Sequence, residues 1–144
     1  MPSLHRPARS VAALLLAVLL LSSCGLAGGS GDAGQGQEMT IEVVLRDIHR
    51  CSRISPEIQV SGAPAGTASY EVRLVEYGAE ERFLGGGVWP ATGDGIIPEG
   101  VLTRHYRGPC PPPDTRREYG FRVAALDRES SRPLAVCLYR FSQE

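Results

Sequence analysis

Apolar and polar residues alternate in short runs along residues 39–144, which predicts β-structure for this part of the chain. The clearest run is Ser69–Tyr77, where Tyr70, Val72 and Leu74 fall on one face and charged residues lie between them. Side chains of a strand point alternately to its two faces, so we expect these three residues to face a core. The run predicts one half-buried strand.

Four other segments have the composition of strands, and the segments between them are rich in glycine and proline. The four are Thr40–Leu45, Ile58–Val60, Tyr119–Ala125 and Leu134–Phe141. We expect Tyr119, Phe121 and Val123 to point inward, and the last segment predicts a central strand because it is apolar on both faces. Short strands separated by such turns predict an all-β domain of two packed sheets.

Three segments interrupt this pattern. Gly85–Gly87 and Gly93–Gly95 break any regular alternation, so we expect no regular element at either place. Residues 79–82 have room for one helical turn at most, and we expect Glu80 and Glu81 to lie on a solvated turn. No longer window has the period of an amphipathic helix, which leaves little helix in the predicted domain.

The most unusual segment is Tyr106–Pro113, with the sequence YRGPCPPP. Four of its last five residues are prolines, which fix φ and lack an N–H, so the segment predicts neither helix nor central strand. Cys110 alone among these five keeps an N–H, and we expect Gly108 to turn sharply at positive φ. The segment is a stiff loop, and the pattern fits either a plain connection between strands or the wall of a binding site.

The first residues predict export. A basic segment at residues 5–9 precedes Val11–Leu21, an unbroken apolar run of eleven residues that is too short to span a bilayer comfortably. The run ends in Leu21–Gly25, with the sequence LSSCG, which resembles the lipobox of bacterial lipoproteins. The resemblance implies that residues 1–23 are a signal peptide and that Cys24 is lipidated. An ordinary secretory signal with an incidental cysteine is the alternative.

The next residues predict a tether and then one domain. Residues 24–38 are rich in glycine, serine and glutamine and have too little apolar surface to fold, so we expect a flexible link between membrane and domain. Residues 39–144 have the usual size of a single domain. All 15 basic residues are arginines, and the formal net charge is −1. No basic stripe is present, which argues against nucleic acid as a partner.

Cysteine usage predicts one disulfide in an exported chain. Apart from Cys24, the chain has Cys51, Cys110 and Cys137, which allow three pairings. We favour Cys51–Cys110, because both residues lie in predicted loops whereas Cys137 lies in a predicted strand and is expected to be buried.

The sequence offers little catalytic chemistry. His49 lies two residues before Cys51 and His105 five before Cys110, but neither pair has the spacing of a zinc site. A nucleophile built from Cys110 and His105 would have prolines on both sides of the cysteine and would be silenced by a disulfide. We therefore expect no catalytic residues, no metal and no cofactor.

Four segments, in order along the chain, carry recognisable motifs: Cys51–Ile58 (CSRISPEI), Gly62–Tyr70 (GAPAGTASY), Tyr106–Pro112 (YRGPCPP) and Tyr119–Asp127 (YGFRVAALD). Together they resemble the phosphatidylethanolamine-binding protein family, in its bacterial Raf-kinase-inhibitor-like branch. The resemblance implies a β-sandwich of the Greek-key type. It also implies a small anion-accepting pocket near one end, with the Gly-Pro loop as one wall.

The resemblance also implies a set of ligand-binding residues. They are Tyr106, Gly108, Pro109, Cys110, Pro111, Tyr119, Glu76 and Arg117. Two histidines of the family's pocket fall near Phe83 and at Arg117 in this chain, and one carboxylate of the pocket survives as Glu76. Loss of an imidazole removes a charge-assisted hydrogen bond of roughly 1.5–3 kcal/mol. The planar guanidinium of Arg117 can offset this loss if it points inward.

These features predict a lipid-anchored, non-catalytic binding module of the bacterial cell envelope, on the periplasmic face of the outer membrane or the exterior of the cell membrane. Its expected ligand is a small anion or a phosphoryl head group. The alternative is an envelope domain with a vestigial pocket, whose surface binds a protein partner or inhibits an enzyme.

Overall fold

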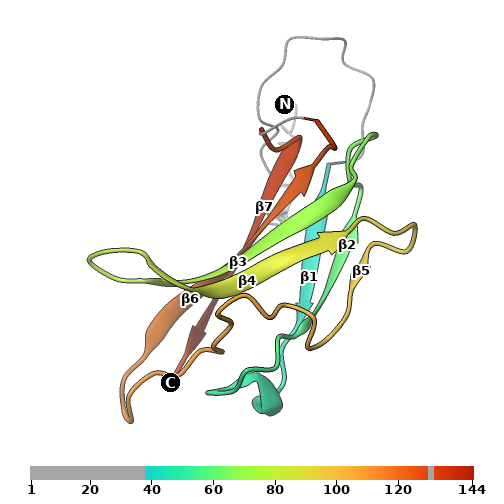
Figure 1. Ribbon diagram of the computed structural model, residues 1–144. Coiled ribbons are helices and arrows are strands. Elements are labelled where there is room, and N and C mark those ends of the chain that lie inside the picture. Colours follow the sequence, from blue (N-terminus) through green and yellow to red (C-terminus); the bar gives the residue numbers. More distant parts are fainter. Residues whose placement is uncertain (1–37, 130–131) are drawn as a thin grey trace, which may run out of the picture.

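The computed structural model describes residues 38–129 and 132–144, so the predicted signal peptide, Cys24 and nearly all of the tether lie outside the described residues. Seven strands form two antiparallel sheets, with one short 3-10 helix, η1 (Asp47–His49), in the described part (Figure 1). Within these residues, no helix is long and apolar enough to cross a membrane. The predicted all-β fold class is confirmed.

The strands agree in large part with the predicted runs. They are β1 (Thr40–Val44), β2 (Glu57–Ser61), β3 (Ser69–Tyr77), β4 (Arg82–Pro90), β5 (Ile96–Ile97), β6 (Arg117–Leu126) and β7 (Ala135–Gln143). One sheet has the order β1-β2-β5 and the other has the order β4-β3-β6-β7. In Figure 1 the long strands β3 and β4 cross the direction of β1.

The core lies between the two sheets. From β3 it takes Tyr70, Val72 and Leu74, each at most 3% exposed, as the alternation predicted. The same cluster contains Tyr119, Phe121 and Val123 of β6 and residues of the smaller sheet, among them Ile58 and Ile97. Full burial of one large apolar side chain contributes about 1.5–3 kcal/mol, so this cluster holds the two sheets together.

Two predictions about the larger sheet are wrong. Leu134–Phe141 was expected to be central, but β7 is an edge strand, and Leu138 on its outer face is 40% exposed. Gly85–Gly87 was expected to break regular structure, but these glycines lie inside β4. A Cβ on Gly85 would lie 2.4 Å from the Cα of Tyr106, so glycine is needed where another segment covers the edge of β4. An antiparallel bridge between Gly86 and Arg104 forms that cover.

The predicted disulfide between Cys51 and Cys110 is present and joins two loops that are 59 residues apart in sequence. Two backbone hydrogen bonds lie beside it: Cys51 N–H donates to the Pro109 carbonyl at 2.9 Å, and Gly108 N–H donates to the Ser52 carbonyl at 2.7 Å. We call residues 49–52 and 108–110, with this disulfide, the loop clamp.

Gly108 serves the loop clamp in a way that the sequence did not predict. It does not adopt a positive φ, whereas His105 (φ 53°) and Asp114 (φ 58°) do so on either side of it. A Cβ on Gly108 would lie 2.0 Å from the carbonyl oxygen of His49. Glycine is therefore required because two backbones approach each other closely, not because the chain turns there.

Cys137 is buried, as expected, and its sulfur lies 2.9 Å from the Met39 carbonyl oxygen. Among the described residues no cysteine has a free thiol. The last strand therefore contributes its cysteine to the core and offers no reactive surface thiol.

We predict that Gly108→Ala lowers the free energy of unfolding by about 3 kcal/mol, the upper end of the usual cost of overpacking, because a backbone carbonyl blocks the new methyl group. Gly93→Ala is the matched control, since no atom lies within 4 Å of its Cβ position. The control should stay within about 0.5 kcal/mol of wild type in urea denaturation. Equal stability of the two variants would contradict the close approach.

Candidate functional site

The register of the larger sheet brings three of the predicted ligand-binding residues to one place. Glu76 of β3 lies opposite Tyr119 of β6, and Tyr119 lies opposite Phe141 of β7. Opposed residues of antiparallel strands share a face, and so do residues two apart along a strand, which places Arg117 on the same face. These residues continue the core-facing side of the sheet beyond Leu74 and Phe121.

Glu76 is the anionic centre of this group. Its side chain is 14% exposed and pairs with Arg82 at 2.6 Å and with Arg117 at 3.8 Å. One carboxylate therefore faces two guanidinium groups, and the group has an excess of positive charge. We call Glu76, Arg82, Arg117 and Tyr119 the Glu76 cluster.

A β-bulge explains why Arg82 belongs to the cluster and Phe83 does not. The pairing of β3 with β4 shifts between Leu74 and Val75, so that Val75 lies opposite Phe83 and Glu76 lies opposite Arg82. The shift turns Phe83 to the outer face of the sheet, where it is 40% exposed and its ring centroid lies 5.0 Å from the guanidinium carbon of Arg73. The resemblance placed a pocket residue at Phe83, and this placement is wrong because one extra residue in a strand exchanges its two faces.

Tyr119 is fully buried, and its hydroxyl has no hydrogen-bond partner. Burial, and then the negative charge of Glu76, raise the pKa of Tyr119, while Arg117, Arg82 and the N–H of Cys110 act in the opposite direction. The Cys110 N–H therefore lies close enough to the hydroxyl to affect its pKa. At neutral pH the hydroxyl is protonated and is a donor.

Arg117 supplies a second donor of this kind. Its side chain is 42% exposed, but its Nε is buried and has no hydrogen-bond partner. A buried donor without an acceptor costs about 1–3 kcal/mol. Tyr119 and Arg117 are two residues apart on one face of β6, so both residues with an unpaired donor lie on the same side of the sheet.

The loop residues of the predicted set have different positions. Cys110 is exposed and presents its N–H to the Glu76 cluster, whereas Gly108 and Pro109 are buried and use their backbone groups in the loop clamp. Pro111 is also buried. Tyr106 belongs to the hydrophobic core and is 4% exposed, with a hydroxyl that lacks a partner. Of these residues, Cys110 is the one whose N–H affects the pKa of Tyr119.

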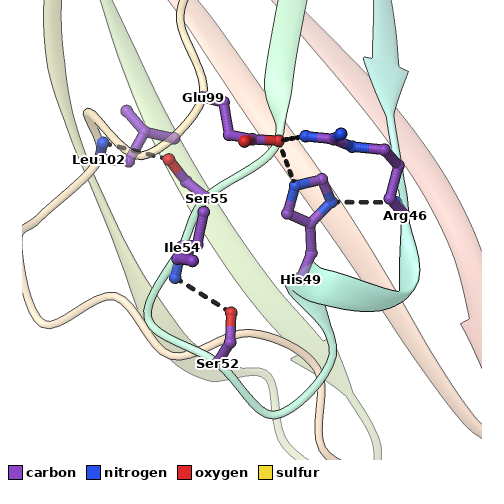
Figure 2. A network of polar contacts seen from close by, with 7 residues as sticks. All are labelled: Arg46, His49, Ser52, Ile54, Ser55, Glu99 and Leu102. Atoms are coloured by element: carbon purple, nitrogen blue, oxygen red, sulfur yellow. Dashed lines mark hydrogen bonds and ion pairs between the residues drawn. The ribbon is translucent and has the colours of Figure 1, made fainter.

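A second polar network lies around His49 (Figure 2). The buried imidazole accepts the Arg46 N–H at Nδ1 (3.0 Å), and its Nε2 lies 2.8 Å from Glu99, so the hydrogen bonds assign the neutral tautomer with Nε2–H as donor. Arg46, and after it His49, hold the pKa of the Glu99 carboxyl below its usual value.

The hydrogen bonds of His49 join segments of the fold and leave the imidazole without a free nitrogen. Both ring nitrogens are engaged, so the imidazole has no nitrogen left to ligate a metal or to remove a proton from a substrate. The network ties η1 to the loop after β5, where Leu102 N–H donates to the Ser55 hydroxyl at 3.2 Å. No local sequence pattern could predict this network, because His49 and Glu99 are 50 residues apart.

The chain was compared with known protein families, curated proteins and solved structures. No protein-family description, no curated protein and no solved structure matches the chain. Within residues 38–129 and 132–144, no group of three or more histidine, cysteine, aspartate or glutamate side chains is placed to hold a metal ion.

The Tyr106 hydroxyl leads to a pH-dependent prediction. Burial raises the pKa of Tyr106 above the value of about 10 that an unfolded tyrosine has. The folded state favours the protonated form, so this contribution to stability is complete below about pH 10 and is lost as the pH rises further. Tyr106→Phe should therefore lose less unfolding free energy than wild type above about pH 10.

At neutral pH the same variant should be as stable as wild type or more stable, because it removes a buried hydroxyl that has no partner. Urea denaturation near neutral pH and at alkaline pH measures both effects. A loss of more than about 1 kcal/mol at neutral pH would mean that the hydroxyl has a partner in solution.

Proposed function

We propose that this protein is a lipid-anchored, non-catalytic binding module of the bacterial envelope that takes a small oxyanion at the Glu76 cluster. The observation that carries the proposal is the pair of buried donors, Tyr119 Oη and Arg117 Nε, which have no acceptor in the protein. Each donor costs stability when it is unsatisfied, so an oxygen ligand is the group that these positions favour.

The charges of the cluster support an anion over a neutral ligand. Arg82 and Arg117 together outweigh the single carboxylate of Glu76. The Cys110 N–H adds a backbone donor from the side of the loop clamp. Phosphate, a phosphomonoester or a phosphoryl head group has the planar pairs of oxygens that a guanidinium group binds through two parallel hydrogen bonds.

The arrangement of the motif segments supports a sandwich of the phosphatidylethanolamine-binding type. The segment GAPAGTASY leads directly into β3, and YGFRVAALD forms most of β6, which pairs with β3 along its whole length. The segment YRGPCPP presents the Cys110 N–H to Tyr119. A Gly-Pro loop beside a tyrosine at the end of a sheet is what the resemblance implied for the pocket.

The sequence of residues 1–38 supports the anchor. In this proposal, residues 1–23 are removed, Cys24 carries the lipid, and residues 25–38 tether the sandwich to the envelope membrane.

The alternative function also has an observation in its favour. The outer face of the larger sheet exposes Val88 (59%), Phe83 (40%) and Leu138 (40%). Exposed apolar residues beside arginines on a sheet are a common composition of protein interfaces. A domain that docks a protein partner or inhibits an enzyme would use this face and would need no ligand at the Glu76 cluster.

Thermal unfolding with inorganic phosphate tests the anion proposal, because a ligand of the native state raises the melting temperature. We expect a rise of several degrees in wild type at saturating phosphate. In Tyr119→Phe the melting temperature without phosphate should be equal or higher, because an unsatisfied hydroxyl is gone, while the rise with phosphate should be lost. Arg117→Ala should lose the rise as well.

Two variants are matched controls. Tyr77→Phe also removes a buried hydroxyl without a partner, but on the opposite face of β3, and Arg116→Ala removes an exposed arginine beside Arg117. Both should keep the wild-type response to phosphate. No response in wild type at millimolar phosphate, or an unchanged response in Tyr119→Phe, would contradict the proposal and favour the docking alternative.

The anchor is tested by the intact mass of the protein exported from a bacterial host. We expect a mature chain that begins at Cys24 and carries the mass of the attached lipid. A chain with an unmodified Cys24, whether as a thiol or in a disulfide, would contradict the lipid anchor.

A further inference from the structure

A second cationic surface lies beside the loop clamp. It is a hollow of about 470 Å³ lined by Arg53, Thr103, His105, Tyr106 and Arg107. Arg53 directly follows the clamp residue Ser52, and Arg107 directly precedes Gly108. None of these five lining residues belongs to the Glu76 cluster.

The charge of this hollow is uncompensated. Its lining has two arginines and one histidine but no aspartate or glutamate. Neither Arg53 nor Arg107 makes an ion pair within residues 38–129 and 132–144. In the Glu76 cluster, by contrast, both arginines face a carboxylate. Like charges around one concavity repel each other, so an anion is the ligand that would stabilise it.

The loop clamp holds the two arginines of the hollow together. They are far apart in sequence, and the Gly108–Ser52 hydrogen bond and the disulfide join the loops that carry them. Arg107 N–H donates to the Leu84 carbonyl at 2.9 Å, which fixes its backbone to β4. His105 is held at φ 53°, a conformation that non-glycine residues rarely adopt and that clusters at functional sites. The backbone of the hollow is thus fixed before a ligand arrives.

We propose that this hollow binds a ligand with two or more phosphoryl groups, such as a diphosphate or a bisphosphorylated head group. Two guanidinium groups that approach from different loops can each take one phosphoryl group through paired hydrogen bonds. The Thr103 hydroxyl and the His105 imidazole supply further donors. The volume of about 470 Å³ exceeds the space that one phosphate fills, which favours the larger anion.

Isothermal titration with inorganic pyrophosphate tests the proposal on the full-length protein. The double variant Arg53→Gln with Arg107→Gln should bind pyrophosphate at least about tenfold more weakly than wild type, since each charge-assisted contact is lost. Arg104→Gln is the matched control, because Arg104 is an exposed arginine of the same segment that does not line the hollow. It should bind as wild type does.

Tyr119→Phe separates this inference from the proposed function. If the hollow binds independently of the Glu76 cluster, Tyr119→Phe keeps the wild-type affinity for pyrophosphate and the double variant loses it. This result does not depend on whether the Glu76 cluster responds to phosphate. The single variants Arg53→Gln and Arg107→Gln, both at exposed positions, should each weaken binding and replace the double variant if it does not fold. Pyrophosphate binding that is absent in wild type, or unchanged in these variants, overturns the proposal.

Vesicle co-sedimentation identifies the source of the phosphoryl groups when it is done in a Cys24→Ser background, which lacks the proposed lipid anchor. Vesicles that contain phosphatidic acid present phosphomonoesters at high density, and phosphatidylcholine vesicles are the neutral control. A lipid head group is supported if wild type binds pyrophosphate and sediments with the acidic vesicles, and if the double variant no longer sediments with them. Binding of pyrophosphate without sedimentation supports a soluble diphosphate.

Discussion

The Cys51–Cys110 disulfide, with the two backbone hydrogen bonds beside it, is the constraint on which both candidate sites depend. It closes a loop across 59 residues, which stabilises the fold by about 4 kcal/mol through loss of chain entropy in the unfolded state. The Cys110 N–H of the loop clamp lies close enough to Tyr119 to affect its pKa. Arg53 and Arg107, which adjoin the clamp residues Ser52 and Gly108 in sequence, line the same hollow. The proline-rich loop adds stiffness, because its residues have few backbone conformations to lose.

The β3–β6 pair contributes the other half of the Glu76 cluster, and a single bulge decides its composition. Without the shift at Leu74–Val75, Phe83 would face Glu76, and the carboxylate would have an apolar neighbour in place of Arg82. The bulge therefore brings a second guanidinium to the carboxylate and turns an aromatic ring to the outer face. The excess of positive charge at the cluster, which supports an anion as the ligand, is a consequence of this local irregularity.

Alternation along the sequence predicted the parts of the fold that bury one face of a strand. Ser69–Tyr77 has the predicted bounds, and the inward residues of β6 are fully buried. The alternation pattern missed β4, because glycines have no side chain that could alternate. The contact that requires these glycines comes from a segment some twenty residues away in the chain. The prediction that β7 is a central strand was wrong, because Leu138 is an apolar residue on an exposed face. The position of Arg82 depends on strand register, and the His49–Glu99 pair depends on a long-range contact. Neither can be predicted from a local sequence pattern.

The claim that the loop clamp orders both sites is tested most directly by amide hydrogen exchange in a variant with Cys51→Ala and Cys110→Ala. We expect exchange of the Gly108 and Arg107 amides to become at least about tenfold faster than in wild type, because the loops open locally, whereas amides at the centre of β3 and β6 stay among the slowest. Unchanged protection of the Gly108 amide in this variant would show that the disulfide does not order these loops.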